Sequence, residues 1–422
     1  MTVRLNRRIH PAWIVAAVAF IALMGAAGFR AAPGVLMVDL NDEFGWSISS
    51  MSVAVSVNIL LYGLTAPFAA ALIGRFGLRS VTLAALVLIA AGSGLTVFVT
   101  SEWVLYLTWG LLIGLGSGSM ALVFAAEISN TWFVTRKGLV TGILSAGSAT
   151  GQLVFLPVIG VLSESTGWRA ASLVVSGAAL AVVPLVYLFV RNHPSELGVD
   201  AFGAIPGTTP PRVRHTGAMS RALSGLRDAA KTRSFWALAA AFFICGATTN
   251  GLVGVHFIPS AHDHGMSITV AAGLLAVVGV FDIVGTVASG WLTDRINPRY
   301  LLTGYYAFRG VGLAFLPLLL SNEVHPSIII FVVVYGLDWV ATVPPTIALC
   351  REYFGERSGI VFGWVFASHQ VGAAFAATAA GLVRDLFGDY AYAWIGGAIL
   401  CVVAAVFSYV VKAPRGGVWA KA

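Results

Sequence analysis

The sequence predicts an all-α membrane protein, with twelve transmembrane helices in two six-helix pseudo-symmetric bundles and both termini in the cytoplasm. Three observations predict this fold class: an apolar composition, twelve long apolar stretches and an internal repeat. Of the 422 residues, 58% are hydrophobic and 10% are charged, whereas a soluble domain carries about 25% charged residues. This composition disfavours a soluble enzyme, a disordered chain and a nucleic-acid-binding protein.

Each predicted span has the length of apolar chain that crosses a bilayer, about 20 residues. The runs are continuously apolar, as in residues 81–91, and do not alternate like the strands of a membrane barrel, so we expect helices. The first run follows three arginines, but it is long and has no clear cleavage site, which favours a retained helix over a signal peptide. The twelve stretches are 12–34, 48–73, 80–100, 103–127, 137–163, 170–190, 234–258, 268–292, 300–320, 326–349, 358–383 and 389–411.

The basic residues lie almost entirely on one side of the predicted membrane. With the N-terminus inside, the inner segments hold 21 of the 25 Lys and Arg residues and the outer loops hold two. Because cytoplasmic loops are enriched in Lys and Arg, this bias predicts cytoplasmic termini in a plasma membrane, here the inner membrane of a bacterium. The net charge of +7 would then face the cytoplasm and anionic lipid rather than nucleic acid.

A polar stretch rich in Pro, Gly, Ser and Thr separates the spans into two sets of six. It divides the chain into an N-terminal bundle (1–190), a cytoplasmic linker (191–233) and a C-terminal bundle (234–422). The two sets repeat, because residues 132–142 (WFVTRKGLVTG) match residues 353–363 (YFGERSGIVFG) at an offset of 221. Two glycine pairs keep this offset: Gly151 with Gly372, and Gly167 with Gly388. Repeats of six spans are typical of secondary transporters.

The short loops after the second and eighth spans carry a second repeated pattern. It reads AALIGRFGLR over residues 70–79 and GWLTDRINPR over residues 290–299. With two copies, twelve spans and a central linker, the whole chain resembles the major facilitator superfamily, whose inner loop motif is Gly-x-x-x-Asp-Arg-x-Gly-x-Arg. The first copy lacks the Asp of this motif. The motif positions that we expect to act in gating or structure are Arg75, Arg79, Asp294, Arg295 and Arg299.

The resemblance implies alternating access, in which the two halves rock about a substrate site near the membrane midplane. An Asp at a helix end can pair with Arg and with a neighbouring helix terminus in one state only; alternatively, the loop arginines only set topology. The implied partners are a small-molecule substrate, a proton and the lipid bilayer, and one chain encloses a pathway, so a monomer is expected. We expect no enzyme activity, cofactor or metal site, because no nucleophile–base pair, cofactor fingerprint or metal-ligand spacing is present.

Ionisable residues inside apolar spans are costly, so each is a functional candidate. Arg30 lies in the first span among small residues and Pro33, which suggests a broken or closely packed helix. Its planar guanidinium can hold a substrate carboxylate by two parallel hydrogen bonds; the alternative is a salt bridge to Asp282 or Asp338 that only holds the bundle together. Burial favours the protonated form of a carboxylate and a nearby arginine favours the charged form, so Asp282 is a candidate for proton coupling.

The other candidates lie in later spans. Asp338 in the tenth span and Arg309 in the ninth are expected to form a structural pair, which we favour over a substrate role for Arg309; Asp338 could still join a proton relay. A histidine in a span could titrate with the proton cycle or simply pack in the core. The remaining expected substrate contacts are Asn250, Tyr335, Trp339 and His369.

Within the superfamily, the chain is similar to the oxalate–formate and monocarboxylate porter branch, on a break expected at Gly28–Pro33, the run before Asp282 and the entries to spans five and eleven. Such porters usually carry an Arg one turn after the Asp; here that position is Thr286, so Arg30 would take over its task. The resemblance predicts proton-coupled transport of a small organic anion, a monocarboxylate. The alternatives are a porter for a larger aromatic or heterocyclic nutrient such as a vitamin, and a drug exporter.

Overall fold

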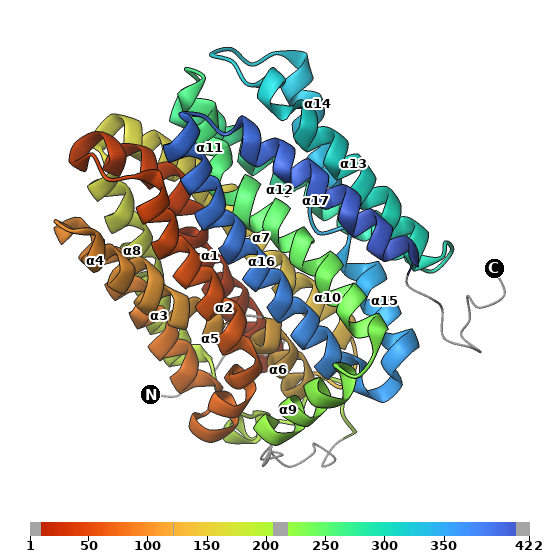
Figure 1. Ribbon diagram of the computed structural model, residues 1–422. Helices are drawn as coiled ribbons and strands as arrows, with labels where there is room; N and C mark the ends of the chain where they lie inside the picture. Colours follow the sequence, from red (N-terminus) through yellow and green to blue (C-terminus); the bar gives the residue numbers. More distant parts are fainter. Residues whose placement is uncertain (1–9, 121, 206–217, 411–422) are drawn as a thin grey trace.

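The computed structural model describes residues 10–120, 122–205 and 218–410, which are almost entirely helical. Among these residues, eleven helices or continuous helical runs are long and apolar enough to cross a membrane. A further 30-residue helix, α7, lies among them, and at 1.5 Å per residue it has the length to cross a bilayer. The predicted all-α, two-bundle fold class is therefore confirmed (Figure 1).

Each half contains six long helical segments. The first half comprises α1 (Pro11–Phe44), α2 (Ile48–Phe76), α3 (Leu78–Leu95), a run of α4 (Glu102–Leu105), η2 (Tyr106–Ile113), α5 (Gly114–Ser119) and α6 (Leu122–Trp132), then α7 (Lys137–Thr166) and α8 (Trp168–Phe189). The second half comprises a run of α10 (Arg233–Gly246), η4 (Ala247–Val253) and α11 (Gly254–Asp263), then α12 (Ile268–Thr293), α13 (Pro298–Leu319), α14 (Pro326–Asp338) with α15 (Val343–Phe354), α16 (Ser358–Phe387) and α17 (Ala391–Val410).

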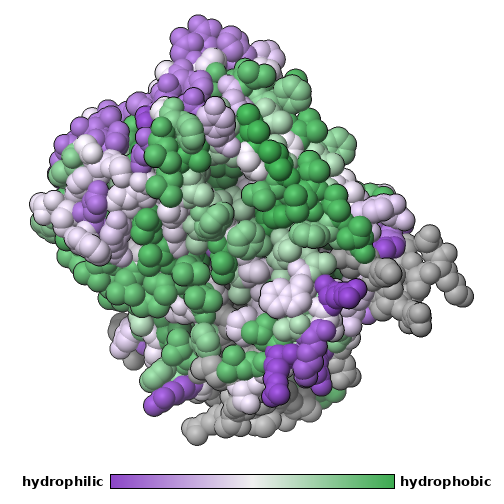
Figure 2. All heavy atoms as spheres, viewed as in Figure 1, coloured by the Kyte–Doolittle hydropathy of each residue, from purple (hydrophilic) through white to green (hydrophobic). Residues whose placement is uncertain are grey.

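The exposed surface of the helices is apolar in a broad band. Figure 2 shows hydrophobic residues over the middle of the molecule and hydrophilic ones at its two ends. Many large apolar side chains of the long helices are exposed, among them Val287 at 71%, Phe308 at 67% and Leu318 at 79%. A soluble monomer rarely exposes a contiguous apolar patch of this kind, whereas helices long and apolar enough to cross a membrane have such a surface.

The sequence repeat appears as repeated packing. Within the first half α1 packs on α7, and within the second half α10 packs on α16. A Cβ placed on Gly151 would lie 2.5 Å from the Met24 carbonyl oxygen, and one on Gly372 would lie 2.0 Å from that of Phe243. Glycine is needed at both positions because the two backbones approach too closely for a side chain.

The halves meet through α2 against α16 and through α7 against α12. We call the end of the molecule with the turns α1–α2, α7–α8, α11–α12 and α16–α17 the loop end, and the end with α9 (Ala218–Ala229) the linker end (Figure 1). Near the loop end, a Cβ on Gly160 would lie 3.2 Å from Thr269 Cα, and one on Gly381 would lie 2.8 Å from Ser49 Cα. The halves are therefore in close contact at the loop end.

The same helix faces are open at the linker end. Gly142 precedes Gly160 by 18 residues, and Gly363 precedes Gly381 by 18, which is five turns of helix. Among the described residues, a Cβ on Gly142 or Gly363 would meet no heavy atom within 4 Å apart from its chain neighbours and the backbone of its own helix. Faces that touch the other half at the loop end thus lie away from it at the linker end.

Two carboxylates cap helices across the interface at the loop end. Glu164 of α7 accepts hydrogen bonds from the Thr269 backbone N (3.2 Å) and hydroxyl (2.5 Å) at the start of α12. Asp385 of α16 accepts from the backbone N of Ile48 (3.3 Å) and Ser49 (2.9 Å) at the start of α2. A carboxylate at a helix N-terminus satisfies orphan N–H groups and complements the helix dipole. Glu164 and Asp385 are 221 residues apart, so these cross-half caps follow the repeat.

The expected break in the first span is not present. α1 continues through Pro33 as far as Phe44, ten residues beyond the predicted end of the span. The helix is instead closely packed, because a Cβ on Gly28 would lie 3.0 Å from the Phe155 ring and one on Gly34 would lie 2.9 Å from the Val255 carbonyl oxygen. Proline is tolerated in membrane helices where neighbouring helices support the freed backbone.

Irregular helix occurs elsewhere. η2 and η4 are π-helical, and α14 and α15 are separated by a turn at residues 339–342. π-helical segments are frequent at functional sites. Both η4 and the turn belong to the second half, and both reach the cavity described next.

Candidate functional site

A cavity of about 80 Å³ lies between the two halves. One water needs about 10–15 Å³ of such space, so the cavity can hold several waters or a small solute. Its walls come from α1, α2 and α7 of the first half and from η4, α11, α12, α16 and the turn after α14 of the second. The polar and aromatic side chains in these walls are Arg30, Asn58, Tyr62, Gln152, Asn250, Asp282, Trp339 and Gln370.

Arg30 forms the positive wall of the cavity. It projects from α1, is partly buried, and donates from Nη1 to the Tyr62 hydroxyl at 3.2 Å. Its Cζ lies 4.5 Å from the centre of the Tyr62 ring, a cation–π distance. Tyr62 of α2 therefore holds the guanidinium at the cavity wall.

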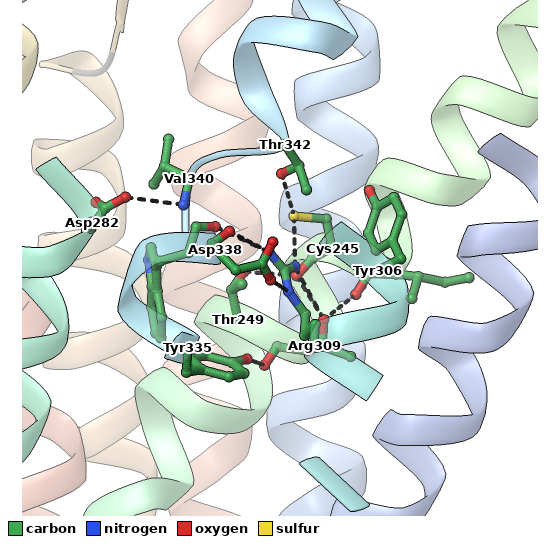
Figure 3. Close-up of polar contacts among 12 residues, drawn as sticks. Cys245, Thr249, Asp282, Tyr306, Arg309, Tyr335, Asp338, Val340 and Thr342 are labelled. Atoms are coloured by element: carbon green, nitrogen blue, oxygen red, sulfur yellow. Dashed lines mark hydrogen bonds and ion pairs between the residues drawn. The ribbon is translucent and has the colours of Figure 1, made fainter. Parts of the chain in front are cut away.

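Asp282 forms the negative wall, from α12 of the other half. Its side chain is largely buried, and Oδ1 accepts hydrogen bonds from the Thr286 hydroxyl and the Val340 backbone N, each at 3.0 Å. Val340 lies in the turn between α14 and α15, where backbone N–H groups lose their helical partners. Asp282 thus connects the cavity with the break in the tenth span (Figure 3).

The other expected substrate contacts divide into two groups. Asn250 and Trp339 line the cavity. Tyr335 and His369 are buried outside its walls: the Tyr335 hydroxyl donates to the Thr248 carbonyl oxygen at 2.7 Å, and the His369 ring lies parallel to that of Phe366 at 5.8 Å.

Arg309 and Asp338 lie together behind the cavity (Figure 3). Arg309 Nε and Asp338 Oδ2 are 2.5 Å apart, and both side chains are buried. Asp338 Oδ1 has no hydrogen-bond partner among the described residues, and Asp338 is not among the cavity walls. The two charges expected to form a structural pair are thus in contact, and neither residue lines the cavity.

The charged residues of the repeated motif, which follow the second and eighth spans, lie at the linker end. Arg79 stacks on the Tyr187 ring, with Cζ 4.2 Å from its centre, and Arg295 stacks on the Trp291 ring at 4.1 Å. These contacts stay within one half each. The others occupy helix ends: Arg75 in the last turn of α2, Asp294 directly after α12, and Arg299 in the first turn of α13.

Four polar residues of the cavity were not predicted: Asn58, Tyr62, Gln152 and Gln370. Asn58 Nδ2 donates to the Trp109 carbonyl oxygen at 2.7 Å, and Gln370 directly follows His369 on α16. One residue along a helix turns the side chain by about 100°, which separates the cavity face from the core face. Uncharged amides within apolar spans are the sequence signal that would have indicated three of these four residues.

A family model for the Major Facilitator Superfamily matches residues 18–377. This match spans most of the chain. The two-bundle fold and the cavity between the halves agree with it. The protein therefore belongs to the major facilitator superfamily, a family of membrane transporters.

Similar sequences and structures are consistent with this assignment. The chain is 25% identical over 383 residues to "Uncharacterized MFS-type transporter YcxA" of Bacillus subtilis, covering 90% of each chain. It is 27% identical over 395 residues to "Monocarboxylate transporter 13" of Rattus norvegicus, covering 91% of this chain and 85% of the relative. The crystal structure of a D-xylose–proton symporter superposes with a TM-score of 0.72 at 16% identity, over 95% of this chain and 98% of that one; this likeness shows the fold alone.

Proposed function

We propose that this transporter carries a small organic anion, a monocarboxylate, together with a proton. The observation that carries the proposal is the cavity between the halves, with Arg30 on one wall and Asp282 on the other. A guanidinium matches a carboxylate in charge and in the geometry of two parallel hydrogen bonds. The names of similar proteins, among them several monocarboxylate transporters, support the same substrate class.

Charge balance explains why a proton would accompany the anion. An anion between Arg30 and an ionised Asp282 leaves one net negative charge in a site of low dielectric, where repulsion is strong. Protonation of Asp282 makes the occupied site neutral, so the substrate and the proton stabilise each other's binding. In this proposal Arg30 binds the carboxylate and Asp282 carries the proton.

Alternating access would follow from the contacts between the halves. The closed loop end and the open faces at the linker end represent one state, and separation of α2 from α16 and of α7 from α12 at the loop end would give the other. We place the linker end in the cytoplasm and the chain in the plasma membrane of a bacterium, working as a monomer. The excess of Lys and Arg on that side supports this orientation.

A thermal-shift screen tests the substrate class. Purified protein is heated with lactate, pyruvate, oxalate, aromatic acids and neutral vitamins, for the parent, Arg30→Ala and Arg30→Lys. A ligand at 100 times its dissociation constant adds about 2.7 kcal/mol to the free energy of unfolding. We expect a monocarboxylate to stabilise the parent, Arg30→Ala to lose the response and Arg30→Lys to retain part of it.

The control is Arg191→Ala, which removes a half-buried guanidinium that donates to the carbonyl oxygens of Tyr187 and Val190 at the linker end, outside the cavity. This variant should respond like the parent. An equal response of Arg30→Ala would show that Arg30 does not bind the substrate.

A larger aromatic or heterocyclic nutrient is the second candidate. It is favoured by one observation, namely that Tyr62 and Trp339 place aromatic rings in opposite halves of the cavity wall. Stabilisation by neutral aromatic compounds alone, in the same screen, would select this candidate over the monocarboxylate.

A further inference from the structure

Behind the cavity, Arg309 contacts two irregular helix segments rather than Asp338 alone. Its Nη2 donates to the carbonyl oxygens of Asp338 (2.8 Å) and Trp339 (3.3 Å). These carbonyls lie where α14 ends and the turn 339–342 begins, so the break has removed their helical donors. A buried cation at a helix C-terminus satisfies such groups and complements the helix dipole.

The other side of the guanidinium contacts the end of α10 and the start of the π-helical segment η4. Arg309 Nη1 lies 3.1 Å from Cys245 Sγ and 3.5 Å from the Thr248 hydroxyl oxygen. The same region is joined to the tenth span twice more, because the Tyr335 hydroxyl donates to the Thr248 carbonyl oxygen and Cys245 Sγ lies 3.2 Å from Thr342 Oγ1. The buried cluster therefore bridges the two irregular segments (Figure 3).

Both segments place residues in the cavity. η4 carries Asn250, and the turn carries Trp339; both line the cavity. The turn is held from the cavity side as well, by Asp282 on the Val340 backbone N. Arg309 lies on α13, which contributes no residue to the cavity walls.

We propose that Arg309 is a positioning residue, which sets the shape of the cavity by holding the broken tenth span and η4 together from behind. It acts on Trp339 and Asn250 through backbone carbonyls, Cys245 and Thr248, and does not touch the substrate. A structural ion pair would need only the Nε contact with Asp338. The two roles differ in what a lysine can replace, because a lysine supplies one charged nitrogen and not a planar fork of donors.

The test measures cavity shape without a substrate. Asn250→Cys serves as a reporter, and its rate of modification by sulfonatoethyl methanethiosulfonate, a small anionic thiol reagent, is measured in detergent. Cys245, Cys350 and Cys401 are buried, and each variant without the reporter gives the background rate. The variants are Arg309→Lys, the charge-free double variant Arg309→Met with Asp338→Leu, and Tyr306→Phe.

Tyr306→Phe is the matched control. Tyr306 lies on the same helix, is fully buried, and donates its hydroxyl to the Ala241 carbonyl oxygen of α10 at 2.8 Å. It belongs to the same region but does not contact the break. Loss of this hydroxyl should lower the free energy of unfolding and leave the shape of the cavity nearly unchanged.

We expect the reporter rate to change by about tenfold in Arg309→Lys and in the double variant, and by less than about twofold in Tyr306→Phe, where tenfold corresponds to about 1.4 kcal/mol. A parental rate in Arg309→Lys, or an equal change in Tyr306→Phe, would overturn the proposal. If Arg309→Lys does not fold, the double variant decides by the same thresholds, because it leaves no buried charge unpaired.

The inference rests on the proposed function only in taking this cavity as the substrate site. Lactate binding by the same variants, without the reporter, separates the two ideas. If the reporter rate changes as expected but no carboxylate stabilises even the parent, the monocarboxylate proposal fails and the positioning role stands. If lactate binds the parent and the reporter rates are all parental, the positioning role alone fails.

Discussion

Arg30 and Asp282 reach one cavity from opposite halves, and the way each is held limits what it can do. Asp282 uses a single oxygen, Oδ1, to accept from both Thr286 and Val340. That pair of bonds fixes the carboxylate against the turn in the tenth span. The role of Asp282 as acceptor and its proposed role as proton carrier can therefore be separated by substitution.

Asp282→Asn is expected to keep binding and to lose coupling. The amide oxygen can still accept from the Val340 N–H, so the turn stays in place, but the amide cannot carry a proton. In proteoliposomes, substrate exchange should stay within about threefold of the parent, while uptake driven by a pH gradient should fall by at least about tenfold. Equal loss of exchange and driven uptake would instead indicate that Asp282 binds the substrate or only supports the fold.

At the residue scale, the sequence identified charges well and hydrogen-bonding geometry poorly. Arg30 and Asp282 could be found because a charge inside an apolar span is rare and costly. His369 was selected where its neighbour Gln370 reaches the cavity, since the helix phase relative to the cavity depends on tertiary packing. The bonds from Asp282 and Arg309 to backbone atoms of the tenth span could not be predicted, because a backbone group has no residue-specific signal.

At the scale of the helices, we expect the cross-half caps at the starts of α2 and α12 to stabilise the closed loop end. A carboxylate at a helix N-terminus contributes about 0.5–2 kcal/mol. Replacing Glu164 and Asp385 by alanine should therefore weaken the closed state by about 1–4 kcal/mol in total. The population with an open loop end would rise accordingly.

Spin-label distances measure this shift. With labels at Thr166 and His262, which are exposed at the loop end in different halves, the double variant should gain a longer-distance population. The matched control replaces Glu102 and Glu323, two acids of the same end, by alanine and should keep the parental distribution. An unchanged distribution in the Glu164/Asp385 variant would rule out a gating role for the caps.

The docking of α9 should depend on pH at acid values only. Asp228 accepts from Lys231 Nζ at 3.0 Å and from Arg357 Nη1 at 2.7 Å. The pKa of Asp228 lies below its ordinary value of 3.8, mainly because of the hydrogen bond from Lys231, followed by the charge of Lys231 and the hydrogen bond from Arg357. Because the carboxyl paired with Lys231 and Arg357 has the lower pKa, the contribution of these pairs is complete above the ordinary value and is lost as the pH falls through the lowered one.

A spin label at the exposed Leu223 reports this docking. Its mobility should be constant from neutral pH down to the ordinary carboxyl range and should rise below it. In Asp228→Asn, mobility should be high at every pH, and salt should reduce the difference because the pair is exposed. A pH-dependent step near neutrality that persists in Asp228→Asn would assign the effect to another group.

The regular helices could be predicted at this scale and the irregular ones could not. Apolar runs of about 20 residues located every long segment, because burial in lipid imposes that length. The π-helical segments and the turn at 339–342 have the same apolar composition as regular helix. Their geometry depends on partners such as Arg309 in another helix, which hydropathy does not record.

For the whole molecule, the proposed orientation makes a simple prediction. In intact cells, a membrane-impermeant maleimide should modify His264→Cys at the loop end and should leave Lys231→Cys at the linker end unmodified until the cells are permeabilised. The reason is that the basic side of a membrane protein stays in the cytoplasm. The reverse pattern would place the linker end outside the cell. The state described here would then be closed toward the cytoplasm and open toward the outside.

The two-fold repeat was visible in the sequence, but its consequence for the interface was not. The matched segments around residues 132–142 and 353–363 predicted two similar halves. Gly160 with Gly381 and Glu164 with Asp385 share the same offset, yet their importance depends on which helix of the other half lies opposite. That pairing is a property of the assembled bundle.

The cross-half caps also limit which substitutions the interface between the halves can accept. Three backbone N–H groups donate to these caps, those of Ile48 and Ser49 in the first turn of α2 and that of Thr269 in the first turn of α12. Any residue but one supplies the same backbone donor at these positions, and Thr269 donates through its hydroxyl as well. The exception is proline, which fits the first turn of a helix well but has no N–H. A proline that leaves the helix intact at Ser49 or Thr269 would thus remove a backbone donor to the cap without lowering the stability of the helix itself.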